Sequence, residues 1–413
     1  MIGGGMAGVL CARLLTDAGV NCALVEAREI GGGTTKGTTA VLTAQHDTLY
    51  SDLIDQFGTE KAAQYLHANL CAVERLRKLA RGILCEWENQ PSVMYVQRDP
   101  RALEREMDAL HTLGFQAARW QTEIPLPIPV AGAICYPEMA QLHPLQFLYG
   151  AAEGLRIYEH SLVNCLKGHT AYTEHGAITA EHIVVATHFP FVNRHGLYFM
   201  KLYQNRSFVL ALENAPTLHC TLVDAGEAGL YFRNAHGLLL VGGGDRRTGC
   251  KGADFEGLRA FTRKTLPGTK ELFAWAAQDC MSLDGVPYIG AYSPKLPYVY
   301  VATGFNEWGM TTSMVAAEVL TARILGKENP DAAVFAPKRS MLSKQLFANA
   351  GETMLRFCVP TLRRCPHLGC ALKWDAQEHS WECPCHGSRF EEQGALTDGP
   401  ALHEARTVKK KRA

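Results

Sequence analysis

The sequence predicts an α/β protein with an α+β part, built from a Rossmann-like nucleotide-binding domain, an antiparallel domain and a small C-terminal β unit. Three observations predict this class: a G-x-G-x-x-G motif at the start, a strand-rich stretch over residues 195–282, and a cluster of cysteines and histidines beyond residue 360. A chain of 413 residues is also too long for one ordinary core, which favours several units.

The composition is that of an ordinary globular protein, with 47% hydrophobic and 20% charged residues. The formal net charge is zero, so no global electrostatic argument favours binding to nucleic acid or to an anionic membrane. We find no apolar run of about 18 residues and no basic stretch followed by an apolar one at the start. We therefore expect a cytoplasmic protein with no integral membrane segment.

The first element is a nucleotide-binding turn. Gly3, Gly5 and Gly8 form the G-x-G-x-x-G motif, an apolar helical stripe follows over 9–18, and a buried strand is expected over 20–25. Gly3 would allow the tight turn, Gly5 the approach of a pyrophosphate, and Gly8 the packing of helix on sheet. The pyrophosphate would lie at the helix N-terminus. The alternative is a glycine-rich turn that binds no ligand.

Glu26 closes the expected strand, where a carboxylate can accept hydrogen bonds from an adenosine ribose. Only Met1 and Ile2 precede the first glycine, whereas strands normally need about five residues. We therefore expect a shortened first strand, and a natural start upstream of Met1 would account for it.

Residues 28–46, "REIGGGTTKGTTAVLTAQH", distinguish between nucleotide cofactors. A loop of glycines and threonines directly after the acidic strand end is typical of FAD sites, because its hydroxyl and free N–H groups can reach phosphate, ribityl chain and flavin edge. The segment resembles the D-amino-acid oxidase-like superfamily of FAD-dependent oxidoreductases, and within it the branch that carries a C-terminal Rieske domain. The resemblance implies cofactor contacts from Thr34, Thr35, Thr38, Thr39 and Ala40.

Helices and short strands alternate in the next part of the chain. The periodicity predicts helices over 60–81, 101–113 and 141–152, and strands over 156–165, 171–173 and 182–186. The resemblance implies that this return to the nucleotide domain supplies cofactor contacts near Val163 and at Ala186.

The stretch 195–282 is expected to form an antiparallel substrate domain over the flavin. Gly242–Gly244 follow a strand, but no helix begins soon after them, so a hairpin or turn is a better interpretation than a phosphate loop. Tyr231, Arg233 and Arg246 are candidate substrate-facing groups, because an arginine fork suits a carboxylate. The alternative for each arginine is a solvated surface position.

A second strand, over 298–302, leads through Gly304 into a helix that starts near Met310. A helix N-terminus there would face a negative centre. By resemblance, backbone N–H groups at this end stabilise the reduced flavin, with contacts assigned to Gly304, Asn306, Gly309, Met310 and Thr311. An ordinary strand–loop–helix is the alternative. No catalytic base stands out, and hydride transfer to flavin can be driven by positioning.

The C-terminal unit follows an expected helix over 339–357 and offers a possible metal site. Cys365 and His367 form a C-x-H pair, and Cys383 and His386 form a C-x-x-H pair. Two thiolates with two imidazoles suit a Rieske [2Fe–2S] cluster, in which cysteines bind one iron and histidines the other. Zinc accepts the same set, and a unit without metal also remains open.

The flanks of this set, "CPHLGC" and "CPCHGS", resemble Rieske proteins of the respiratory type. The resemblance implies a disulfide between Cys370 and Cys385 and a covering proline loop at Gly399–Ala401. The strands that usually precede the first ligand loop look deleted here, so we expect the cluster lobe to lean on the flavoprotein body. The basic tail at 408–413, "VKKKRA", is expected to be solvated.

These features predict a flavoprotein over 1–338, with nucleotide-binding segments at about 1–50, 140–195 and 283–330, a connecting helix over 339–358, and a truncated Rieske domain over 359–413. The resemblance implies an FAD-dependent oxidoreductase of the amine or amino-acid dehydrogenase type, acting on CH–NH or CH–OH donors of small molecules. Electrons would pass from flavin to the [2Fe–2S] cluster, and from its histidine-ligated iron near the surface to an unidentified one-electron acceptor. The alternatives are an oxidase with a structural cluster and a non-enzymatic redox sensor.

Overall fold

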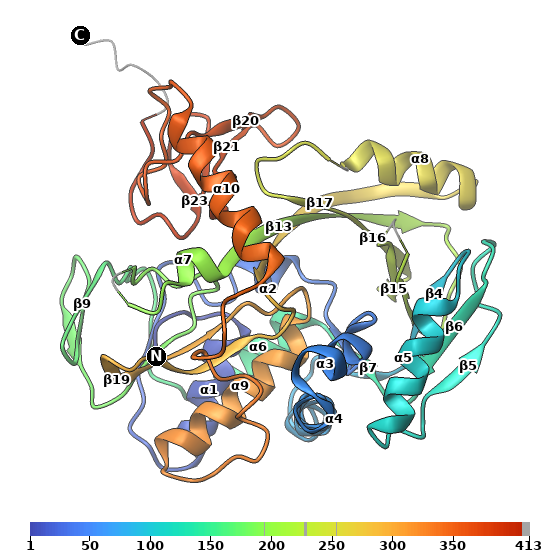
Figure 1. Ribbon diagram of the computed structural model, residues 1–413, viewed down its shortest axis with the longest axis horizontal. Coiled ribbons are helices and arrows are strands. Elements are labelled where there is room, and N and C mark those ends of the chain that lie inside the picture. The colour runs from blue at the N-terminus through green and yellow to red at the C-terminus, as the bar shows by residue number, and fades with distance from the viewer. Residues whose placement is uncertain (194, 227–228, 253, 407–413) are drawn as a thin grey trace.

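The computed structural model describes residues 1–193, 195–226, 229–252 and 254–406 (Figure 1). The basic tail at 408–413 lies outside the described residues. Of the helices described, none combines the length and the apolar character that crossing a bilayer requires.

The nucleotide-binding sheet is built around the first two residues. Ile2 bridges in parallel to Val25 on one side and to Val185 on the other, so the short first strand has the central place expected of it. The sheet continues through β1 (Leu24–Val25), β8 (Ile157–Tyr158), β12 (Ile183–Val185), β19 (Leu296–Thr303) and β18 (Tyr288–Ser293). The strands expected over 20–25 and 156–165 are shorter than predicted, because few of their residues face a partner strand.

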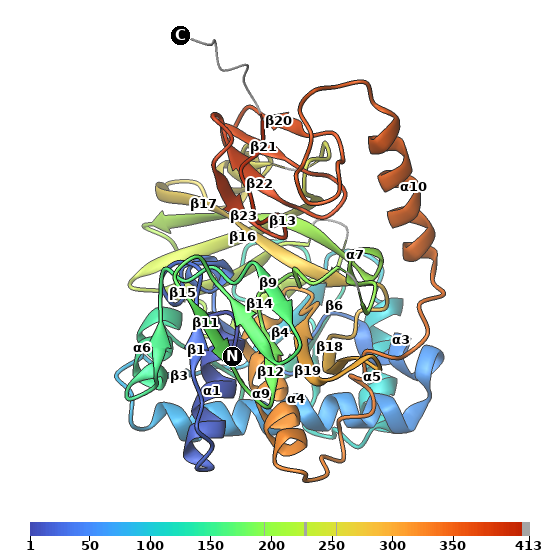
Figure 2. The same cartoon turned by 90° about the vertical axis from the view of Figure 1, so that its left-hand side faces the viewer.

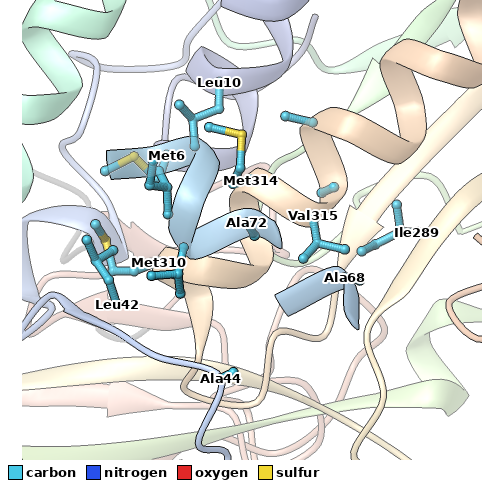
Figure 3. Close-up of a cluster of buried hydrophobic side chains, with 14 of the residues drawn as sticks. Met6, Leu10, Leu42, Ala44, Ala68, Ala72, Ile289, Met310, Met314 and Val315 are labelled. Atoms are coloured by element: carbon cyan, nitrogen blue, oxygen red, sulfur yellow. The ribbon is translucent and has the colours of Figure 1, made fainter. Parts of the chain in front are cut away.

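Three helices form the core beneath this sheet: α1 (Met6–Asp17), α4 (Thr59–Ala80) and α9 (Gly309–Ile324). Met6 and Leu10 of α1 meet Met310 and Met314 of α9, and small residues such as Ala72 of α4 let the helices approach (Figure 3). Burying each large apolar side chain contributes about 1.5–3 kcal/mol. This packing fixes the N-termini of α1 and α9 relative to each other.

The second sheet has eight strands in the order β17-β13-β16-β15-β14-β4-β6-β5. Their bounds are β4 (Ser92–Val96), β5 (Arg119–Gln121), β6 (Gly132–Tyr136), β13 (Leu202–Glu213), β14 (Thr221–Asp224), β15 (Tyr231–Ala235), β16 (Leu238–Arg247) and β17 (Lys270–Ser282). The turn predicted at Gly242–Gly244 is wrong, because these glycines lie inside β16. The ring of Tyr231 packs over Gly242, where an added Cβ would lie 2.1 Å from the ring.

The remaining elements of the flavoprotein body connect these sheets. They are α2 (Thr34–Gly37), β2 (Val41–Leu42), α3 (Leu49–Phe57), β3 (Glu88–Asn89), α5 (Arg101–Thr112), β7 (Ala140–Gln141), α6 (Pro144–Ala152), β9 (Cys165–Lys167), β10 (Thr170–Tyr172), β11 (Ala177–Thr179), α7 (Tyr198–Lys201) and α8 (Phe255–Thr265). The helix predicted over 141–152 begins at Pro144, because Gln141 pairs in β7 and the His143 side chain caps the helix.

The connecting helix α10 (Lys344–Cys358) begins later than the predicted 339. Arg339 instead forms an ion pair with Asp284 at 2.6 Å, and Ser343 caps the helix. The C-terminal lobe beyond it is a four-stranded antiparallel sheet of β20 (Lys373–Asp375), β21 (Ser380–Glu382), β22 (Arg389–Glu391) and β23 (Leu396–Asp398). Figure 2 shows this lobe above β13, β16 and β17, with α10 beside it.

Candidate cofactor, substrate and cluster sites

Three adjoining cavities lie between the two sheets and the C-terminal lobe. We call them the nucleotide cavity (about 870 Å³), the middle cavity (about 100 Å³) and the inner cavity (about 230 Å³). Thr34 lines all three, and Asp279, Glu307 and Met310 line both the middle and the inner cavity. This arrangement suits a long cofactor whose reactive end meets a substrate.

The nucleotide motif surrounds the first cavity largely as predicted. Gly3, Gly5, Glu26 and Val163 line it. Glu26 accepts a hydrogen bond from the backbone N–H of the intervening glycine at 2.6 Å, which stabilises the turn. Gly8 does not line the cavity: an added Cβ would lie 1.8 Å from the carbonyl oxygen of Gly3, so Gly8 serves the close packing of α1.

The glycine–threonine loop reaches the middle cavity. Thr34, Thr35 and Thr38 line it, whereas Thr39 lines the inner cavity and Ala40 lines none of the three. Thr35 Oγ1 accepts a hydrogen bond from the backbone N–H of Met6 at 3.1 Å, which ties the loop to the start of α1.

Arg233, predicted as a substrate-facing group, holds this loop in place. Its Nη1 donates to the carbonyl oxygens of Thr39, Ala40 (3.0 Å) and Leu142 (3.3 Å). Tyr231 lines the inner cavity as predicted. Arg246 lies elsewhere: it forms an ion pair with Asp375 of the C-terminal lobe.

The loop before α9 bears on the middle cavity. Gly304 lies in this loop, and Gly309 and Met310 begin α9; all three line the middle cavity. Ala186, which follows β12, lines it from another side of the sheet connection. Asn306 and Thr311 do not line it; they shape the surrounding loops instead.

The Asn306 side chain accepts from the backbone N–H of Ser282 at 2.7 Å and donates to the carbonyl of Gly285 at 2.8 Å. Thr311 Oγ1 accepts from the backbone N–H of Thr43 at 3.0 Å. These side-chain hydrogen bonds hold the loops around the middle cavity, and the cofactor contacts expected at Asn306 and Thr311 stay predictions.

Four carboxyl groups of the inner cavity were not predicted from the sequence. Asp47 is exposed and Asp279 half-buried where they open on the cavity, and the loss of bulk water inside it raises the pKa of each to about 6. Burial and the charges of Asp279 and Asp47 raise the pKa of Asp245 to about 7. Burial, followed by the charge of Asp245, raises the pKa of Glu307 well above its usual range. These residues come from four separate segments, so no spacing in the sequence signals them.

The predicted cluster ligands meet in the C-terminal lobe. The thiol groups of Cys365 and Cys383 hydrogen-bond to each other, which lowers the pKa of Cys365. The ring centroids of His367 and His386 lie 4.9 Å apart. Cys370 and Cys385 form a disulfide that ties the two ligand loops together.

The histidines are arranged to give Nδ1 to an iron. His386 Nε2 lies 3.0 Å from the carbonyl oxygen of Phe199, which can only accept, so Nε2 carries the hydrogen. His367 Nε2 lies 3.0 Å from Asn193 Oδ1. Burial lowers the pKa of His386 to about 3 and of His367 to about 4, so both rings are neutral at pH 7. Nδ1 of each ring is buried with no hydrogen-bond partner among the described residues, which fits a [2Fe–2S] cluster.

The histidine edges face the flavoprotein body, where His386 is buried and His367 is half-buried. The surface position expected for the histidine-ligated iron stays a prediction. The lobe is clamped there by charged groups. Arg206, which is 1% exposed, forms ion pairs with Glu378 and with Glu382 (3.9 Å). Arg247 donates to the carbonyl oxygens of Pro384 (2.8 Å) and Cys385 (3.1 Å).

Comparisons with known proteins agree with this arrangement. Residues 1–323 match the family model for FAD dependent oxidoreductase, and residues 356–409 match the Rieske [2Fe-2S] domain. Over 99% of its length the chain is 31% identical to YhfW of Bacillus subtilis, a protein named for a Rieske 2Fe-2S centre, of which it covers 92%.

Solved structures share the fold of the body. L-Proline dehydrogenase from P. horikoshii (19% identity, TM-score 0.69) is matched over 82% of this chain and 96% of that one. Glycine oxidase from Geobacillus kaustophilus (21% identity, TM-score 0.66) is matched over 82% and 97%.

The fold and the site therefore define a flavoprotein with an attached iron–sulfur lobe. The chain belongs to the FAD-dependent oxidoreductase family and carries a C-terminal Rieske domain. It is an enzyme whose cofactors are FAD and a [2Fe–2S] cluster, which decides the choice between cluster and zinc.

Proposed function

We propose that the protein is a dehydrogenase of small molecules with a CH–NH donor, and that its electrons leave through the [2Fe–2S] cluster to an external one-electron acceptor. One observation carries this proposal: the nucleotide cavity has Gly3, Gly5 and Glu26 on one side and residues 395–404 of the cluster lobe on the other. A cluster with a purely structural role would not need to adjoin the cofactor cavity.

Gln278 of β17 connects the two sites directly. Its carbonyl oxygen accepts a hydrogen bond from the hydroxyl of Thr34 in the cofactor loop at 3.1 Å. Its side-chain amide donates to the carbonyl oxygen of Gly387 in the second cluster loop at 2.8 Å. Gln204 donates to the neighbouring carbonyl of His386 at 2.6 Å. These bonds set the distance between cofactor loop and cluster loop.

When bound, FAD takes up a hydride, that is two electrons, and the cluster carries electrons onward one at a time. The residues of the chain position the cofactor and the donor molecule relative to each other. The N-terminus of α9 presents backbone N–H groups and a positive dipole end at the middle cavity, where negative charge is stabilised. The inner cavity holds the donor molecule next to it.

The donor class is supported by the names of structural neighbours, which include a proline dehydrogenase and a glycine oxidase. Both names denote enzymes that act on amino acids. The domain boundaries proposed are a flavoprotein over 1–338, a connecting helix over 339–358 and a Rieske domain from 359.

The proposal is tested by removing a cluster ligand. In Cys383→Ser, anaerobic bleaching of the flavin by the best donor from an amine and amino-acid panel should persist, while reduction of cytochrome c should be largely lost. The exposed, unpaired Cys358 provides a matched control, since Cys358→Ser should keep both activities. Rapid formation of peroxide in air, unchanged in Cys383→Ser, would instead support an oxidase with a structural cluster.

A further inference from the structure

Helix α10 turns its apolar side chains outward, the reverse of an ordinary surface helix. Phe347 and Met354 are each 71% exposed, and Leu355 is 64% exposed. At 3.6 residues per turn these three lie on one face, together with the exposed Ala348 and Gly351. We call these five residues the outer face of α10. Figure 2 shows the helix at the edge of the molecule, and an exposed apolar face of this kind marks an interaction site.

Polar contacts hold the opposite side of the helix against the protein. Asn349 is buried there, and its Oδ1 accepts hydrogen bonds from Arg247 at 2.8 Å and from Gln345 at 3.0 Å. Arg356 forms an ion pair with Glu352 at 2.6 Å. Arg247 also binds the second cluster loop, so the helix and the lobe share one anchor. These contacts fix the rotation of α10 about its axis and keep the apolar side chains outward.

Apolar groups also lie at both ends of the helix and beside it. Leu342, which precedes α10, is 81% exposed, and Leu362, which follows it, is 84% exposed. An apolar cavity of about 350 Å³ lies between α7 and α10, with Phe199, Met200 and Phe357 in its wall. The apolar surface is therefore more extensive than scattered single side chains, which need no explanation.

The charges that flank the outer face of α10 are of one sign. Residues 338–364 include six basic side chains and a single acidic one, Glu352, which is already paired. Lys338, Lys344 and Arg363 are exposed and form no ion pair with the residues that the structure describes. Apolar side chains flanked by unpaired basic groups complement an anionic lipid layer, which is apolar inside and negatively charged at its surface.

We infer that the outer face of α10 docks on an anionic lipid surface. Phe347, Met354 and Leu355 enter the boundary between headgroups and acyl chains, and Lys344, on the same side of the helix, meets the headgroup phosphates. With 15 residues α10 is shorter than the about 20 that cross a bilayer, so it lies along the surface. The zero net charge of the whole chain does not oppose this docking, because the basic groups are gathered locally.

The test sediments the holoprotein with vesicles of phosphatidylcholine alone and with vesicles that also contain phosphatidylglycerol. We expect the mixed vesicles to bind at least about tenfold more tightly, and added salt to reduce the difference. Phe347→Ser and Leu355→Ser should each weaken binding to the mixed vesicles about tenfold, because each removes an apolar side chain from the interface. Lys344→Gln should weaken it about fivefold.

Phe273 of β17 is 62% exposed and lies outside this surface, so Phe273→Ser is the matched control and should bind as the wild type does. Flavin and cluster absorbance report that each variant is folded. The inference is overturned by no vesicle binding, by equal binding to both kinds of vesicle, or by folded Phe347→Ser and Leu355→Ser variants that bind normally.

Self-association without vesicle binding, abolished by Phe347→Ser, would also overturn the inference and assign the outer face of α10 to a second copy of the chain. The measurement uses neither an electron donor nor an electron acceptor. Its outcome is therefore separate from that of the proposed function.

Discussion

Replacing Arg206 by alanine should detach the cluster lobe from the flavoprotein body. Arg206 is 1% exposed and lies between Glu378 and Glu382 of the lobe, so its removal leaves buried carboxylates short of a cation. Breaking a buried ion pair costs about 3–5 kcal/mol. We expect the lower end of that range, because Arg389 also contacts both glutamates at 3.2 Å.

The loss is measured by urea unfolding, followed separately through the cluster absorbance and the flavin absorbance. The cluster transition of Arg206→Ala should move to lower urea while the flavin transition moves less. Arg259 on α8 gives the control, since its ion pairs with Glu256 and Glu271 are at the surface and Arg259→Ala should cost less than about 1 kcal/mol. Equal midpoints for the two variants would show that Arg206 does not hold the lobe.

Replacing Gly8 by alanine should strongly weaken FAD binding. The added methyl group would lie 1.8 Å from the carbonyl oxygen of Gly3, so α1 must move away from the nucleotide turn. Overpacking of this kind costs about 1–3 kcal/mol, which corresponds to about a tenfold to hundredfold rise in the FAD dissociation constant. The constant is measured by reconstituting the apoprotein with FAD and following the quenching of flavin fluorescence.

Gly351 in α10 is the matched position, because a Cβ there would have no heavy atom within 4 Å. Gly351→Ala should bind FAD normally and gain up to about 1 kcal/mol of helix stability. Wild-type affinity in Gly8→Ala would show that the helix can shift without disturbing the turn, contrary to the role assigned to Gly8.

The parts of the fold that follow local rules were predictable from the sequence. The glycine motif, the helices now described as α4, α5 and α9, and the paired Cys/His loops are each signalled by residues close together in the chain. The predicted ends of helices and strands were wrong where contacts with distant parts of the chain decide where an element begins. Arg339 is drawn into an ion pair with Asp284, for example, and the helix predicted from 339 begins at Lys344.

The sites that depend on side-chain direction in strands were missed. Arg246 and Asp245 are neighbours on β16, yet one faces the cluster lobe and the other lines the inner cavity, because successive strand residues point to opposite faces. Gln278 and Asp279 divide in the same way on β17. Without the strand register, the sequence could not show which member of each pair faces the substrate.

Flavin and cluster are expected to exchange electrons within one chain. Flash photoreduction of the flavin under anaerobic conditions measures this exchange, with flavin and cluster followed at their own absorption bands. We expect the cluster to become reduced in the same first-order phase in which the flavin is reoxidised, at a rate independent of protein concentration. A flavin that stays reduced until oxygen is admitted, beside a cluster that stays oxidised, would contradict it.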